Sequence, residues 1–275
     1  MHTSARPDDV LLDIDTLDVA YGKAQVVHGL SLQVRKGEFV VILGRNGAGK
    51  SSLLHAVSGL IPKQAGRVHF KGQDISQATP RHIVRQGLVQ VLEGHRVFHH
   101  LSVQDNLLIG TYANAPAGDR SKLDAIYAMF PELADRKQQM ASRLSGGQQQ
   151  ILAVAQGVIA EPVLLILDEP SSGLAPLVIE RILDVASQLC TQGMSILLVE
   201  QLVDKALRHA HYAYLMETGR IAGSGFADDL RDSDLLQRVG QFGLRMSNII
   251  RKKVDLAAER LEAQRRLMPR LSDLA

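Results

Sequence analysis

The segment from Gly44 to Ser52 reads GRNGAGKSS, which has the spacing of a loop that binds the phosphates of a nucleotide. An apolar run, FVVIL, precedes it, and Leu53, Leu54 and Val57 follow at helical spacing. Between a strand and a helix, the backbone N–H groups of such a loop face the phosphates, Lys50 reaches the terminal phosphates, and the Ser51 hydroxyl is placed for Mg²⁺. The residues expected to contact the nucleotide are Gly44, Arg45, Asn46, Gly47, Ala48, Gly49, Lys50, Ser51 and Ser52.

The segment 163–170 reads VLLILDEP, in which two acids follow a second apolar run. A strand that is apolar on both faces belongs in the middle of a covered sheet, and the polar groups at its carboxyl end emerge beside the phosphate loop. There Asp168 can hold Mg²⁺, and Glu169 can orient a water molecule and take its proton during attack on the terminal phosphate.

A third motif, LSGGQQQ at 144–150, stands directly before a helical run. Ser145 is a good N-cap, and the two glycines after it allow a close backbone approach, so this helix start is a second anion site. The two phosphate-binding segments are too far apart in the expected architecture to hold one nucleotide. A two-fold dimer would pair the loop of each subunit with the Ser-Gly-Gly of the other.

The order of the expected elements predicts an α/β fold with a parallel sheet. Strands and helices alternate after residue 162, which requires crossover helices. Between about 94 and 160 the apolar period is helical, which indicates an inserted helical block. The expected strands are 11–19, 26–34, 39–43, 67–70, 88–92, 163–167 and 195–199, with a closing hairpin at 212–223; the helices outside the inserted block are 50–58, 79–86, 177–189 and 202–209.

The composition is that of a globular chain of 275 residues, 45% of them hydrophobic. The net charge of +2 conceals an asymmetry, because eight Lys or Arg and four Asp or Glu fall after residue 244, which leaves −2 on the preceding residues. A slightly negative charge over the first 244 residues is not typical of a nucleic-acid-binding protein. The single cysteine suits a reducing cytoplasm, and no apolar run approaches the roughly 20 residues of a membrane helix.

With GRNGAGKS, LSGGQ and LLILDEP in this order, the chain resembles the ATP-binding subunits of ABC transporters over about 11–230. The resemblance implies ATP and Mg²⁺ as cofactors, a P-loop core with a parallel sheet, an antiparallel β subdomain and an inserted helical subdomain. It implies that Tyr21 stacks on adenine. It also implies that Ser145, Gly146, Gly147 and Gln148 contact the γ-phosphate held by a second ATPase subunit in an ATP-sandwich dimer.

Three positions narrow the branch of the family. Glu93 stands where most members have a metal-sensing, coupling glutamine, and the resemblance makes it a contact of both nucleotide and metal. Ala175 stands where many members have Asp, and Gln201 where they have a switch histidine. With these three residues, the chain resembles the ATP-binding subunits of importers of branched-chain amino acids and of amides or urea. That implies two membrane-spanning permease subunits, an extracytoplasmic solute-binding protein, and a place on the cytoplasmic face of the inner membrane.

Two features depart from that branch: Leu92 replaces a proline, and AQG at 155–157 replaces an arginine-containing triplet. The predicted domains are 1–244, with the helical subdomain at about 94–160, and a basic amphipathic helical extension at 245–275. The extension fits a helix packed on its own domain or on a neighbouring subunit, a helix on acidic lipid headgroups, or a disordered end.

Two other functions are consistent with the motifs. A soluble ABC-type ATPase acting on nucleic acid or ribosomes usually has two cassettes, a coiled-coil insertion or zinc-binding cysteines, which this chain does not show. A regulatory module without hydrolysis would not need Lys50, Asp168 and Glu169 together. In the transporter interpretation, Lys50, Glu169 and Gln201 are the catalytic residues, the metal ligands are Ser51, Asp168 and Glu93, and the second ATPase subunit is a paralogue or a second copy.

Overall fold

The larger of two sheets has six strands in the order β10-β9-β3-β8-β7-β6. The computed structural model describes residues 9–113 and 120–231. Strands β9, β3, β8, β7 and β6 run parallel, and β10 pairs antiparallel with β9 at one edge. The bounds are β3 Phe39–Leu43, β6 Leu88–Val91, β7 Leu164–Asp168, β8 Ser195–Glu200, β9 Tyr212–Glu217 and β10 Arg220–Phe226. Because these strands are parallel, their carboxyl ends share one edge of the sheet.

The central strands β3, β7 and β8 are buried at every residue. Alternate residues such as Ile42 and Val199 pack in one core cluster with helix α1, Lys50–Val57. The intervening residues face the opposite side, where α7, Pro176–Thr191, and α8, Val203–His209, contact the sheet. Helices on both faces explain the unbroken apolar runs in the sequence.

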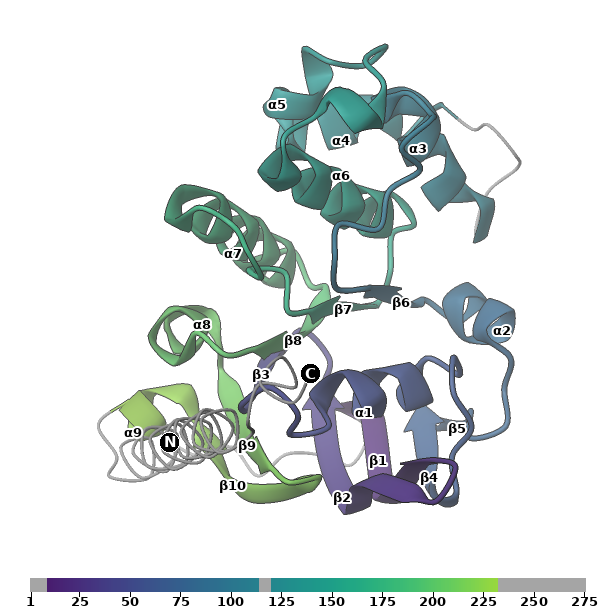
Figure 1. Cartoon of the computed structure of the whole chain (residues 1–275), viewed down its shortest axis with the longest axis vertical. Helices are drawn as coiled ribbons and strands as arrows, with labels where there is room; N and C mark the ends of the chain where they lie inside the picture. Colours follow the sequence, from purple (N-terminus) through teal and green to yellow (C-terminus); the bar gives the residue numbers. More distant parts are fainter. Residues whose placement is uncertain (1–8, 114–119, 232–275) are drawn as a thin grey trace, which may run out of the picture. The chain divides into compact units, whose positions relative to one another are not determined.

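A second sheet of four antiparallel strands has the order β2-β1-β4-β5. Its strands are β1 Val10–Tyr21, β2 Ala24–Arg35, β4 Ala65–Phe70 and the short β5 Gln73–Asp74. Buried residues of β1, β2 and β4 share the core cluster with α1, so this helix joins the two sheets (Figure 1). The predicted strands 11–19 and 26–34 are confirmed, and they pair with each other in antiparallel orientation.

The inserted helical block is formed by α3 Val103–Gly110, α4 Leu123–Met129, α5 Pro131–Ala134 and α6 Gly146–Ile159, which Figure 1 shows gathered together. Helix α6 joins the block to the sheet, because a Cβ added at Gly157 would meet Val91 of β6 and Leu165 of β7 at 2.8 and 3.1 Å. The short α2, Pro80–Arg85, precedes β6. The predicted fold class, a parallel sheet with an antiparallel β subdomain and a helical insertion, is confirmed.

The last described element is α9, Ala227–Arg231. The predicted boundary at 244 and the extension at 245–275 lie outside the described residues. Among the helices that the structure describes, none is long and apolar enough to cross a membrane.

Candidate nucleotide site

The phosphate loop begins where β3 ends and leads directly into α1. Gly49 forms the N-cap of this helix with φ of +98°, a left-handed conformation that favours glycine. A Cβ at Gly49 would lie 2.6 Å from the carbonyl oxygen of Val26, so the site also lacks room for a side chain. The loop thus leads directly into the first turn of α1, whose N–H groups have no partner within the helix and can face a phosphate, as the sequence predicts.

Lys50 is 3% exposed and lies at the centre of the site. Its ammonium donates to the carbonyl oxygens of Gly44 and Arg45 at 2.8 and 3.0 Å. The same nitrogen lies 2.9 Å from Oε1 of Glu169. The loop lysine and the proposed base, separated by more than a hundred residues in the sequence, are thus in direct contact.

Asp168 lies at the end of β7 beside the first turn of α1. Its Oδ1 accepts a hydrogen bond from the Ser51 hydroxyl at 3.0 Å, and its Oδ2 accepts one from the amide of Gln90 in β6 at 3.4 Å. His55, one turn further along α1, places Nε2 3.8 Å from Oδ2. Burial, with the charges of Glu169 and Glu93, raises the pKa of Asp168 to about 6, although Ser51 and Lys50 oppose the shift.

The donor set beside the loop fits Mg²⁺. This ion prefers hard oxygen ligands, and the Ser51 hydroxyl and the Asp168 carboxylate lie together at the start of α1. A buried carboxylate with a raised pKa gains most from a neighbouring cation. Ser51 and Asp168 are thus suited to hold the ion beside the phosphates.

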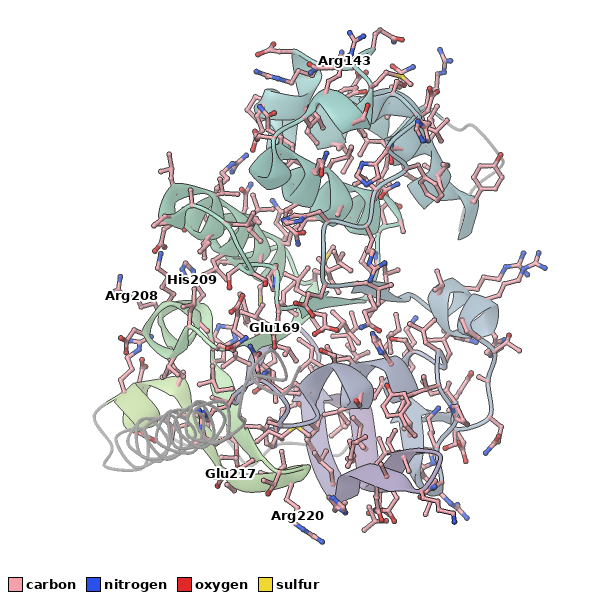
Figure 2. All side chains as sticks on the ribbon, in the orientation of Figure 1. Arg143, Glu169, Arg208, His209, Glu217 and Arg220 are labelled. Atoms are coloured by element: carbon pink, nitrogen blue, oxygen red, sulfur yellow. The ribbon has the colours of Figure 1, made fainter. Side chains whose placement is uncertain are left out.

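Glu169 and Gln201 directly follow two neighbouring strands, β7 and β8, and meet through their side chains. The amide nitrogen of Gln201 donates to Oε2 of Glu169 at 2.6 Å. Glu169 has φ of +44°, an uncommon value for a residue with a side chain. Figure 2 shows Glu169 near the carboxyl ends of β7 and β8 and the start of α1. Strained backbone of this kind often occurs at functional sites.

The Ser-Gly-Gly motif forms a separate site at the start of α6. Ser145 and Gln148 make a full capping box, in which each side chain bonds the backbone N–H of the other. Gly147 packs against α7, because a Cβ there would meet Val178 at 2.9 Å. Figure 2 shows Arg143, two residues before Ser145, well apart from Glu169. The Ser-Gly-Gly motif therefore lies apart from the phosphate loop, as expected, and its contact with phosphate stays a prediction.

Tyr21 and Glu93 make no side-chain hydrogen bond that the structure describes with Lys50, Asp168 or Glu169. Tyr21 ends β1 and is 50% exposed, which leaves its ring free to meet a ligand. Glu93 lies in the exposed turn after β6, where its backbone oxygen accepts from Arg96. Its charge reaches Asp168, whose pKa it helps to raise. The adenine and metal roles of these two residues stay predictions.

Three further polar residues of the site were missed from the sequence. Gln90 and His55 approach Asp168, and Glu200, the last residue of β8, is 2% exposed. The signal for Glu200 was available, because SILLVE, like LLILDE, is an apolar strand that ends in an acid. Gln90 interrupts an apolar strand, whereas His55 has no distinguishing pattern.

The unusual triplet at 155–157 has a structural explanation. Gln156 donates its amide to the backbone oxygen of Asn106 at 2.7 Å. Asn106 is fully buried and bonds the backbone of Phe98 in both directions, at 2.8 and 3.0 Å. The glutamine therefore links α6 to α3 and, through Asn106, to the segment that follows Glu93.

Comparisons with known proteins agree with this geometry. A family model described as ABC transporter matches residues 27–172. The chain is 39% identical over 211 residues to the high-affinity branched-chain amino acid transport ATP-binding protein BraG of Pseudomonas aeruginosa, covering 77% of this chain and 91% of that protein. It is 31% identical to the probable branched-chain amino acid transport ATP-binding protein LivF of Archaeoglobus fulgidus, with coverages of 81% and 95%.

A solved structure of an ATP-binding cassette of an ABC transporter, in its ADP conformation, has the same fold. Its TM-score is 0.73 at 24% identity, and the match covers 83% of this chain and 97% of that one. The family model covers more than half of this chain, and the relatives are matched over nearly their full length. The chain therefore belongs to the ABC transporter family and is an ATP-binding, ATP-hydrolysing member of it.

Proposed function

We propose that this ATPase powers an importer of branched-chain amino acids or of related small polar solutes such as amides and urea. Two relatives are named for branched-chain amino acid transport. Glu93, Ala175 and Gln201 stand at the three positions that distinguish this branch. The single observation that carries the catalytic proposal is the cluster of Lys50, Glu169 and Gln201 within hydrogen-bond distance.

In the proposed mechanism, the loop N–H groups and Lys50 bind the β- and γ-phosphates of ATP. Ser51 and Asp168 would hold Mg²⁺, which would neutralise charge that develops on the transferred phosphoryl group. Tyr21 would stack on the adenine. Binding of phosphate would draw Lys50 away from Glu169, because the three N–H donors of its ammonium are already taken by Gly44, Arg45 and Glu169.

Glu169 would then orient the attacking water and accept its proton. Gln201 would hold the Glu169 carboxylate through the bond at 2.6 Å and place its amide near the γ-phosphate. An amide donates and accepts hydrogen bonds but does not titrate near neutral pH. Glu169 is therefore the base in this scheme, and Gln201 is a positioning group.

We further propose that two ATPase subunits close on ATP, each offering Ser145, Gly146, Gly147 and Gln148 to the nucleotide of the other. Figure 2 shows Arg143, two residues before this motif, well apart from Glu169, the residue that Lys50 contacts, and this separation supports such an arrangement. The dimer would sit on two membrane-spanning permease subunits at the cytoplasmic face of the inner membrane and work with an extracytoplasmic binding protein. Glu93 and the helical block would carry the motion to the permease subunits.

The experiment is reconstitution of the chain in proteoliposomes with permease, ATPase and solute-binding-protein subunits of the same organism. Uptake of labelled leucine, acetamide and urea is measured with ATP inside or outside. We expect uptake of one of these solutes to require ATP on the ATPase side and to be lost in Glu169→Gln. Stimulation of ATPase activity by ribosomes or nucleic acid, without uptake of any of these solutes, would instead favour the soluble alternative.

A further inference from the structure

Glu200 is a buried acid that the proposed mechanism does not use. It ends β8 and is 2% exposed. Burial raises the pKa of its carboxyl group, and hydrogen bonds from Ser171, Gln201 and Leu202 oppose that shift. A buried carboxylate is costly in an apolar core unless hydrogen-bond donors surround it, as they do here.

The donors to Glu200 come from two different loops. Oε1 accepts from the backbone N–H of Ser171 at 3.1 Å, and Oε2 accepts from the Ser171 hydroxyl at 2.8 Å. Oε2 also accepts from the backbone N–H of Gln201 at 3.1 Å. Ser171 follows Glu169 by two residues after β7, so the carboxylate ties the loop after β7 to the loop after β8.

These bonds close a ring around the proposed base. The chain runs from Glu169 through Pro170 to Ser171, which bonds Glu200; the next residue, Gln201, returns to Glu169 at 2.6 Å. Glu169 also keeps an uncommon φ of +44° within this ring. A short polar ring with every bond at or below 3.1 Å fixes the position of a side chain better than any one of its bonds alone.

We propose that Glu200 is a positioning residue that sets the geometry of Glu169 and Gln201 by clamping Ser171. The inference rests on the proposed roles of Glu169 and Gln201. Within the part of the chain that the structure describes, the hydrogen bonds of its side chain go to Ser171 and to the loop after β8, and none goes to Lys50, Ser51 or Asp168. Its loss should therefore affect the rate of hydrolysis and leave ATP binding nearly intact.

The test uses the purified full-length chain and measures kcat and KM for ATP hydrolysis, affinity for a fluorescent ATP analogue, and Tm. Glu200→Gln removes the charge and turns an NH₂ group toward two donors. We expect kcat to fall about tenfold, with KM and analogue affinity within about twofold, because a misplaced catalytic group slows the chemical step. Ser171→Ala should lower kcat by about threefold, and Ser171→Thr, which keeps the hydroxyl, should restore the rate.

The double variant Ser171→Ala, Glu200→Gln should be no slower than Glu200→Gln alone, since both changes break one contact. Glu180→Gln is the matched control, because it also breaks a carboxylate contact at 2.8 Å, with Lys205 on the neighbouring helix α8. It should keep the wild-type kcat. Should Glu200→Gln fail to fold, Ser171→Ala carries the test by itself.

A folded Glu200→Gln or Ser171→Ala with wild-type kcat would overturn the inference, as would equal losses in kcat and analogue affinity. Glu169→Gln, assayed in parallel, separates this result from the proposed function. If Glu169→Gln is inactive while both other variants hydrolyse ATP normally, only the role of Glu200 fails. If Glu169→Gln itself is fully active, the catalytic assignment fails first.

Discussion

The ammonium of Lys50 lies 2.9 Å from the carboxylate of Glu169, and both side chains are buried. The proposed phosphate-binding lysine and the proposed base therefore neutralise each other within the chain. The γ-phosphate of ATP would compete with Glu169 for Lys50. Release of the carboxylate from this ion pair would leave Gln201 as its partner and free one oxygen for the attacking water.

The first prediction concerns Glu169→Gln. We expect ATP binding to persist and kcat to fall by about 10² to 10⁴, because the amide keeps the shape of the side chain and cannot take a proton. Single-turnover ATPase assays and ATP-analogue binding measure the two effects separately. Glu217→Gln, at the exposed end of β9, is the control and should be fully active. Wild-type turnover in Glu169→Gln would remove Glu169 from the catalytic role.

The second prediction concerns Gln201, which donates to Glu169 at 2.6 Å. Gln201→Ala deletes this donor, and we expect kcat to fall about tenfold. Gln201→His retains an N–H donor of similar reach and should keep most of the activity. Steady-state ATPase rates are measured across pH 5.5 to 8.5. The profiles of the wild type and of Gln201→Ala should have the same shape near pH 6.5, because an amide does not titrate there. Full activity of Gln201→Ala would mean that this donor does not position the base.

The third prediction follows from the pKa of Asp168, which burial and the charges of Glu169 and Glu93 raise from 3.8 to about 6. The folded chain thus binds this proton more tightly than the unfolded chain. Its contribution to stability is greatest below about pH 4 and is lost as the pH rises to about 6. Asp168→Asn cannot ionise, so its unfolding free energy relative to the wild type should rise by roughly 1 kcal/mol between pH 5 and pH 8.

Urea denaturation in EDTA measures this difference between Asp168→Asn and the wild type at the two pH values. EDTA removes divalent cations, which would favour the carboxylate and mask the effect. Asp13→Asn is a suitable control, since Asp13 lies on β1 and its hydrogen bond with Gln33 is exposed to solvent. The same difference from wild type at both pH values for Asp168→Asn would show that the carboxyl group titrates normally.

The sequence was sufficient to predict the main elements and the central cluster. Lys50, Asp168 and Glu169 each follow an apolar strand or stand at a helix start, so parallel pairing alone brings them to one edge. The contacts of Glu200 and Gln156 could not be predicted in this way. Glu200 bonds Ser171 only because two loops fold against each other, and Gln156 bonds Asn106 only because α6 crosses α3 closely. Such contacts depend on loop conformation and helix packing, which leave no periodic pattern.

The last prediction tests that close crossing of α3 and α6. A Cβ at Gly110 would lie 2.5 Å from the backbone oxygen of Gln156 and 2.6 Å from Cγ2 of Ile159, and backbone cannot give way as a flexible side chain can. Gly110→Ala should therefore lower the unfolding free energy by about 1 to 3 kcal/mol, despite the better helix propensity of alanine. Gly225→Ala in β10 is the control, since the nearest atoms to its Cβ would belong to the side chain of Leu230, at 3.4 Å or more. Urea denaturation compares the two variants with the wild type. If Gly110→Ala is as stable as Gly225→Ala, α3 and α6 can move apart at little cost. The close contact of these helices, which includes the bond from Gln156 to Asn106, would then contribute little to the stability of the helical block.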